Sequence, residues 1–309
     1  MKKLLILLAI LIAAAAAFFY VKHRTRSAVA GVPTTPSYHE INAQDQIALV
    51  HLACKGQIKI NKDQDGDAYS CSACPPNSDF AGETDTPDAA WTADRAITEG
   101  SFTAPHLHEA VMHIQGCESH ATGFGGAFLY RFTEGAWQLV RYLHGAPIDG
   151  CDVLPFLNDR DALICESSDM HQGIASDSVQ LLMVDSQEPK EDQAFDKNTF
   201  LMVTDEAGYC LDPINPDSLI QYANVDKVAL ISGQNGRKDL AIDTTIGRVK
   251  RGHVTGDNCP DAPKKQYHLV FRNMGDHFEA AEGYAPVAAL KREDCCEVAI
   301  GKIIQPASY

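Results

Sequence analysis

One short pattern recurs along the chain, and a recurring pattern constrains a fold more strongly than local secondary-structure preference does. In each copy an acidic residue is followed by Ala, an apolar strand, a Cys and a Ser or Glu-Ser. The copies are residues 67–72, 109–119 and 161–167. Their cysteines, Cys71, Cys117 and Cys165, are separated by 46 and 48 residues. Cys210 and Cys259 continue the series without the flanking pattern. The recurrence predicts an array of similar units of about 47 residues, with coincidence in a Cys-rich chain as the alternative.

The best-defined unit spans residues 109–145 and predicts β-structure. It divides into three runs rich in β-branched and aromatic residues, and turns that contain Gly separate these runs, as in an antiparallel meander. The second half of this plan, an apolar strand followed by a Gly turn and an aromatic residue, occurs at 129–137 and again at 269–283. Beyond the N-terminal segment we find no convincing amphipathic helix of more than two turns. The sequence therefore predicts an all-β fold.

Two segments carry a resemblance to a known family. Residues 158–165 (Asn-Asp-Arg-Asp-Ala-Leu-Ile-Cys) and 235–242 (Asn-Gly-Arg-Lys-Asp-Leu-Ala-Ile) resemble the Asn-Gly-Asp-Gly, Asp-Leu core of FG-GAP repeats, the blades of integrin-type β-propellers. The apolar runs 126–132 and 178–184 are similar to the strand that follows in that family. The resemblance covers residues 60–285 and implies a β-propeller-like array of four-stranded blades. Paired β-sandwiches are the alternative architecture.

Three apolar strands are expected to occupy equivalent places in successive or alternate units: 110–114, 162–165 and 240–242. Because one sheet alone cannot bury both of its faces, stacking against neighbouring units should bury these strands on both sides. The carboxylates that precede them should lie at one common end of the units: Glu109, Asp161 and Asp239. The interval between the last two exceeds one unit, which predicts an intervening degenerate copy around residues 209–231.

The N-terminal segment predicts a membrane anchor. Residues 4–21 are 18 uncharged residues flanked by basic ones, which reaches the length of a spanning helix. Aromatic residues at 18–20 followed by basic ones are typical of a membrane interface and favour an uncleaved signal-anchor. A cleaved signal peptide and a secreted product are the alternative. The expected organisation is a signal-anchor or signal peptide at 1–26, a linker at 27–43 and a propeller-like extracytoplasmic domain at 44–309.

Charge and cysteine content indicate the partners and the compartment. The chain has 26 Lys and Arg against 41 Asp and Glu, a net charge of −15. Such a surface repels phosphate backbones, so nucleic acid is not an expected partner. Ten cysteines predict an oxidising compartment, the periplasm or the outside of the cell, with most cysteines in structural disulfides. Cys71 and Cys74 have redox spacing, but Pro75 and Pro76 argue against the helix that a reactive thiol needs.

Two sets of residues are candidate metal ligands. Asp63, Asp65 and Asp67 alternate around Gly66, an arrangement by which a loop can wrap oxygen atoms around Ca²⁺; a solvated acidic turn is the alternative. His106 and His108 are expected to share one face of a strand beside Glu109, which suits Zn²⁺ or copper.

Three aromatic residues have two possible roles. Trp91, Trp137 and Tyr142 suit either a core or a sugar-binding platform.

No catalytic motif is found in the sequence. We therefore expect, on fold analogy alone, a non-enzymatic, membrane-tethered module that presents loops to a protein or glycan ligand. A metal-dependent hydrolase or lyase that uses His106, His108 and Glu109 is the alternative.

Overall fold

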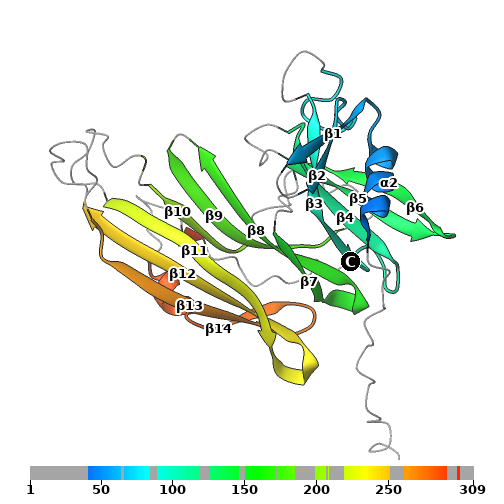
Figure 1. Ribbon diagram of the computed structural model, residues 1–309. Coiled ribbons are helices and arrows are strands. Elements are labelled where there is room, and N and C mark those ends of the chain that lie inside the picture. Colours follow the sequence, from blue (N-terminus) through cyan, green and yellow to red (C-terminus); the bar gives the residue numbers. More distant parts are fainter. Residues whose placement is uncertain are drawn as a thin grey trace, which may run out of the picture. The chain divides into compact units, whose positions relative to one another are not determined.

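The protein is mostly β-structure in a computed structural model (Figure 1). The structure describes residues 41–63, 66–83, 89–118, 125–145, 150–171, 173–184, 199–206, 208, 219–250, 261–290 and 298–299. The strands in these ranges form three antiparallel sheets, none of which closes on itself, so the predicted β-rich fold is confirmed. The expectation of no helix longer than two turns beyond the N-terminal segment is wrong, because residues 43–53 form an 11-residue α-helix. The predicted anchor at 4–21 and the linker up to residue 40 lie outside the described residues. Within those residues, no helix has both the length and the apolar character of a membrane span.

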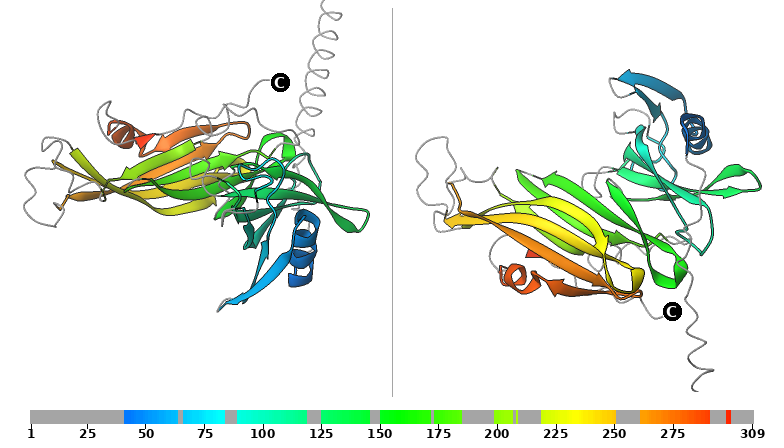
Figure 2. Two further views of the ribbon diagram at one scale, coloured as in Figure 1. Left: turned by 90° about the horizontal axis from the view of Figure 1, so that it is seen from above. Right: turned by 60° about the horizontal axis from the view of Figure 1, so that its bottom comes forward.

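The first sheet has six strands in sequence order: β1 (Ile58–Asp63), β2 (Gly66–Cys71), β3 (Trp91–Gly100), β4 (Glu109–Gly116), β5 (Gly125–Thr133) and β6 (Ala136–Leu143). Helix α2 (Ala43–Ala53) precedes it and begins at Asn42, whose side chain accepts hydrogen bonds from the backbone N–H groups of Gln44 and Asp45. The apolar side chains of the helix pack into a core with the sheet, and Figure 2 shows α2 beside the strands in two orientations.

The other two sheets hold the rest of the described chain. The second sheet has the order β15-β10-β9-β8-β7, with β7 (Cys151–Pro155), β8 (Asp161–His171), β9 (Ile174–Leu182), β10 (Thr199–Asp205) and β15 (Val298–Ala299). The third sheet has the order β11-β12-β13-β14, with β11 (Leu219–Ser232), β12 (Lys238–Lys250), β13 (Lys264–Asn273) and β14 (Phe278–Glu282). Helix α3 (Tyr284–Ala288) follows β14.

All three sheets contain four consecutive strands that pair antiparallel in sequence order. We call these the first meander (β3–β6), the second meander (β7–β10) and the third meander (β11–β14). The predicted equivalent strands 110–114, 162–165 and 240–242 lie in the second strand of each meander, and every residue in them is buried. Glu109 and Asp161 are the first residues of those strands and Asp239 is the second. Burial of these three strands is confirmed. That they occupy equivalent places in successive units stays a prediction, because β4 is the fourth of six strands in its sheet whereas β12 is the second of four in its own.

The two segments that carry the family resemblance adopt the same turn. Each connects the first and second strands of its meander through a short 3₁₀ turn, Leu157–Asp159 in one case and Gln234–Gly236 in the other. Asn158 and Asn235 take left-handed φ values of 56° and 55°, which Asn tolerates better than most residues. The sequence likeness of these two segments therefore reflects a shared local structure.

Residues 162–165 of strand β8 are buried on both faces because their side chains alternate between two cores. Ala162 and Ile164 belong to a core that the second sheet shares with the third sheet. Leu163 and Cys165 belong to a different core, shared with the first sheet. A continuous apolar run is the expected sequence of a strand covered on both sides.

Two parts of the repeat prediction are wrong. In the described part of 209–231 no intervening copy is found, because residues 219–231 belong to β11, the first strand of the third meander. Residues 209–218 lie outside the described part. The cysteine spacing also does not mark equivalent positions. Cys71 ends β2, Cys117 follows the end of β4, and Cys165 lies inside β8. The repeating feature is the meander and its acidic residue, and the period of the cysteines is incidental to it.

Candidate functional site

Six cysteines form three disulfides, Cys54–Cys71, Cys74–Cys117 and Cys151–Cys165. Among the described residues no cysteine is free, and Cys210, Cys259, Cys295 and Cys296 lie outside them. Cys71 and Cys74 bond to different partners, so their redox spacing does not make a dithiol pair. The predicted structural role is confirmed for these six residues.

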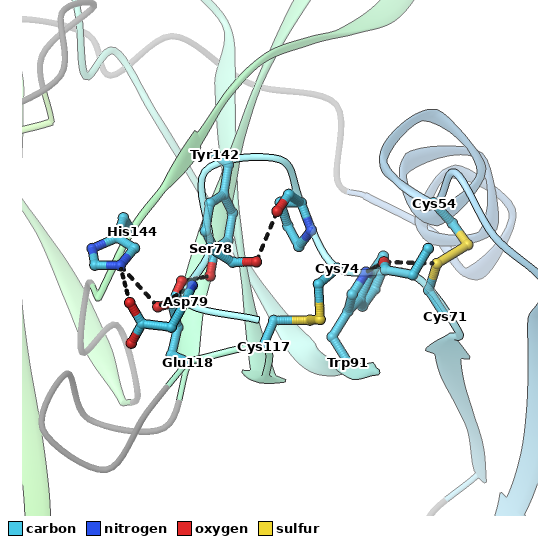
Figure 3. Close-up of a disulfide and its surroundings, with 12 residues drawn as sticks. Cys54, Cys71, Cys74, Ser78, Asp79, Trp91, Cys117, Glu118, Tyr142 and His144 are labelled. Carbon is cyan, nitrogen blue, oxygen red and sulfur yellow. Dashed lines mark hydrogen bonds and ion pairs between the residues drawn. A yellow bond between two sulfur atoms is a disulfide. The ribbon is translucent and has the colours of Figure 1, made fainter. Parts of the chain in front are cut away.

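The Cys74–Cys117 disulfide fixes the loop after β2 to the end of β4 (Figure 3). The contact is reinforced by the Phe80 N–H, which donates to the Cys117 carbonyl oxygen at 3.2 Å. In the same loop the Ser78 hydroxyl donates to the Pro75 carbonyl oxygen at 2.7 Å. These bonds hold the polypeptide on both sides of Asp79 and directly before Glu118.

The backbone after β4 turns sharply through two residues with left-handed φ values, 99° at Gly116 and 66° at Cys117. A Cβ atom at residue 116 would overlap the carbonyl oxygen of Ala90, so this position requires Gly. Cys117 is a non-Gly residue in a conformation that L-residues avoid, and such strain persists only where the surrounding structure imposes it. Here the disulfide and the Phe80 hydrogen bond hold the turn and place Glu118 beside Asp79.

A cluster of polar side chains gathers at this turn, and we call Asp79, Glu118, Tyr142 and His144 the site cluster (Figure 3). His144 Nε2 lies 3.0 Å from Glu118 Oε2 and 3.1 Å from Asp79 Oδ1. The Tyr142 hydroxyl donates to Glu118 Oε1. The Asp79 backbone N–H donates a longer hydrogen bond of 3.4 Å to Glu118 Oε2.

Burial dominates the electrostatics of the site cluster. The Glu118 side chain has no solvent exposure, whereas those of His144 and Asp79 are 43% and 31% exposed. Burial raises the pKa of Glu118, and the hydrogen bond from Tyr142 and the nearby His144 oppose that rise. Burial and the hydrogen bond to Glu118 also raise the pKa of Tyr142, so its phenol stays protonated and acts as a donor. Two groups able to hold a cation, Asp79 and His144, thus lie beside one buried carboxylate.

The histidines named from the sequence lie elsewhere, and the expectation that they share a strand face is wrong. His106 is exposed, with a left-handed φ of 61°, and residues 101–108 connect β3 to β4 without being part of a strand. His108 Nε2 lies 2.6 Å from Glu99 Oε2. The Glu109 carboxylate accepts hydrogen bonds from Thr103 and Arg131. His108 and Glu109 therefore face different partners, and metal binding by His106 and His108 stays a prediction.

The acidic loop predicted to bind Ca²⁺ lies at the end of the β1–β2 hairpin. Asp63 is the last residue of β1 and pairs with Gly66, and Asp67 follows in β2. Asp65 and the side chains of Asp63 and Asp67 lie outside what the structure describes, so calcium binding stays a prediction.

The aromatic residues separate into core and surface. Trp91 and Tyr142 are buried in the core of the first sheet, and the Trp91 indole N–H donates to the Ala73 carbonyl oxygen at 3.0 Å. Trp137 is only half-buried. The core interpretation is therefore right for Trp91 and Tyr142, and Trp137 packs against the same core while part of it stays exposed.

The site cluster is not among the sites predicted from the sequence. A local signal exists, because Glu118 follows Cys117 directly and Asp79 lies five residues after Cys74. Polar residues beside cysteines are common in such chains, however, and this signal does not select these two. Comparison of the chain with protein-family models, curated proteins and solved structures finds no match.

Proposed function

We propose that the chain is a non-enzymatic, extracytoplasmic binding module that presents its loops and hairpins to a protein or glycan ligand. In this proposal the body is a propeller-like array of four-stranded β-units, and the N-terminal segment tethers it to the membrane. The three disulfides support an oxidising compartment.

The propeller-like arrangement draws its support from the two cores of the second sheet. Paired β-sandwiches would require one core between two sheets, as the second and third sheets have. The second sheet has a further core on its other face, shared with the first sheet. Successive face-to-face packing of similar units is how blades stack in an array, so this second core favours the array over the sandwich pair.

The observation that carries the binding function is an aromatic patch, which we define as His108, Phe132 and Trp137. The His108 ring meets the Trp137 ring edge-on with centroids 4.8 Å apart, and the Phe132 and Trp137 rings are 5.3 Å apart. Phe132 is 38% exposed, although it is a large apolar residue. Glu99 adds a carboxylate beside His108.

Trp137 packs against the core of the first sheet, and Phe132 is the ring of the patch that is open to a ligand. The rings of the patch hold each other in place, so a ligand that stacks on them costs little side-chain entropy, and aromatic residues dominate binding energy at many interfaces. The carboxylate of Glu99 offers a hydrogen-bond acceptor at the edge of the patch. A neutral or basic ligand fits the net charge of −15.

A comparison of two variants tests the binding function. Phe132→Ala removes an exposed ring of the aromatic patch, and Tyr284→Ala removes a ring with nearly equal exposure, 39%, from another place. The full-length chain in detergent is applied to a glycan array, and it is cross-linked to neighbouring proteins in intact cells. We expect Phe132→Ala to weaken binding roughly tenfold and Tyr284→Ala to leave it unchanged. No ligand in either arm, or equal loss in both variants, would contradict the proposal.

The membrane tether is tested separately. N-terminal sequencing of the chain recovered from the membrane fraction should show that residues 4–21 are retained. A mature chain that starts near residue 18 would exclude the tether and favour secretion.

A further inference from the structure

Three side chains in the site cluster each offer one atom to a common point. They come from three separate parts of the first sheet: Asp79 from the loop after β2, Glu118 from the turn after β4, and His144 from the end of β6. The three atoms all lie within 4.8 Å of one another. From these contacts we propose that Asp79, Glu118 and His144 bind a divalent transition-metal ion, with Zn²⁺ as the best fit.

The spacing of the atoms suits zinc. His144 Nε2 is 3.0 Å from Glu118 Oε2 and 3.1 Å from Asp79 Oδ1. In a tetrahedral zinc site with bonds of about 2.0 Å, neighbouring ligand atoms are about 3.3 Å apart. The two distances from His144 therefore differ from this spacing by only a few tenths of an ångström, and the third pair of atoms lies within 4.8 Å. Imidazole with two carboxylates is a donor set for zinc or a similar metal, whereas Ca²⁺ prefers six to eight oxygen atoms.

The surroundings orient the ligands. The Tyr142 hydroxyl binds Glu118 Oε1 and leaves Glu118 Oε2 directed to His144 and Asp79. A partner on the second oxygen of a ligating carboxylate is the usual support of a metal site. The Cys74–Cys117 disulfide fixes the two segments that carry Asp79 and Glu118. The ligand positions are thus held before an ion arrives, which lowers the entropic cost of binding it.

Charge favours a divalent ion at this point. Glu118 is fully buried, and a buried carboxylate is stable only when it is paired. A divalent ion at this point would neutralise both Glu118 and Asp79. The exposed parts of His144 and Asp79 leave a path for the ion and room for water as a fourth ligand.

The test is zinc binding by the full-length chain in detergent, after removal of bound metal with a chelator and dialysis. Isothermal titration with ZnCl₂ should show one site that loses affinity on the order of 100-fold in His144→Ala. His268→Ala is the matched control, because His268 is also an exposed histidine paired with a carboxylate, 2.6 Å from Asp243, outside the site cluster. That variant should bind zinc like the unaltered chain.

A second variant, Tyr142→Phe, tests whether the support of Glu118 affects zinc affinity when all three ligands are kept. Tyr142→Phe keeps all three ligands and removes only the hydrogen bond to Glu118, so we expect roughly a tenfold loss of zinc affinity. Titration with CaCl₂ should show no binding that depends on His144. The proposal is overturned if the unaltered chain binds no zinc, or if His144→Ala binds it as tightly as His268→Ala does. It does not rest on the aromatic patch, so either proposal can fail alone.

Discussion

Removing the Cys74–Cys117 disulfide should cost more stability than removing Cys151–Cys165. The two bridges close loops of 43 and 14 residues. In the chain-entropy model a bridge restricts the unfolded chain more when its loop is longer, and these lengths give about 4 and about 3 kcal/mol at 25 °C. The double variants Cys74→Ala/Cys117→Ala and Cys151→Ala/Cys165→Ala remove both sulfurs of a bridge and so leave no new free thiol to mispair.

Urea denaturation followed by tryptophan fluorescence measures the difference. The chain has two Trp residues, Trp91 and Trp137, and both lie in the first sheet. Trp91 donates to Ala73, next to Cys74, so its emission reports on the segment that the first variant releases. Both variants should unfold at lower urea than the unaltered chain, with the Cys74/Cys117 variant the less stable by about 1 kcal/mol.

The same two double variants show whether losing a disulfide weakens zinc binding locally or through a general loss of stability. The Cys74/Cys117 variant loosens the segments that carry Asp79 and Glu118, whereas the Cys151/Cys165 variant leaves the site cluster untouched. Zinc affinity should fall only in the first. A loss below about 1 kcal/mol in both variants, or a reversed order of stability, would refute the loop-length reasoning.

Leu163→Ala and Ile164→Ala should each lower the free energy of unfolding by about 2–5 kcal/mol, because these neighbours on β8 pack into different cores. The exposed control Ile60→Ala should change it by less than about 0.5 kcal/mol, and a near-neutral value for either core variant in urea denaturation would contradict two-sided burial. The pKa of His277 is raised mainly by its hydrogen bond with Asp276, so the stability from this pair is full below the ordinary histidine pKa and is lost as pH rises through the folded value. Asp276→Asn should lower the His277 pKa in an NMR titration, and an unchanged value would exclude this cause. Gly126→Ala should cost about 1–3 kcal/mol in thermal melts, since its Cβ would overlap the Tyr142 hydroxyl and the Leu143 carbonyl oxygen. Adding Tyr142→Phe should recover part of that loss, and no recovery would contradict the proposed clash.

The resemblance of residues 158–165 to 235–242 shows what a local sequence can predict. Both segments place Asn where the turn needs a left-handed residue, and both continue into an apolar strand. Backbone preference and turn geometry depend on residues close together in the chain, so they can be predicted from the sequence. The meanders and their buried second strands were predictable for this reason.

The pairing of the cysteines could not be predicted in this way. Their number predicted disulfides, but their spacing suggested a period that the structure lacks. Which cysteines pair depends on which strands become neighbours, as when Cys151 and Cys165 face each other on β7 and β8. Pairing is decided by sheet register, and several registers are compatible with one pattern of spacing.

The sequence by itself determined a β-rich fold, most of its strands, two tight turns and an oxidisable set of cysteines. Only the tertiary structure decided that β8 is covered by two different sheets, that His106 and His108 lie in a loop, and that the site cluster exists. Asp79 is 39 residues from Glu118 and 65 from His144. No local preference links residues so far apart, because their meeting depends on strand pairing, on the left-handed turn after β4 and on the disulfide that closes it.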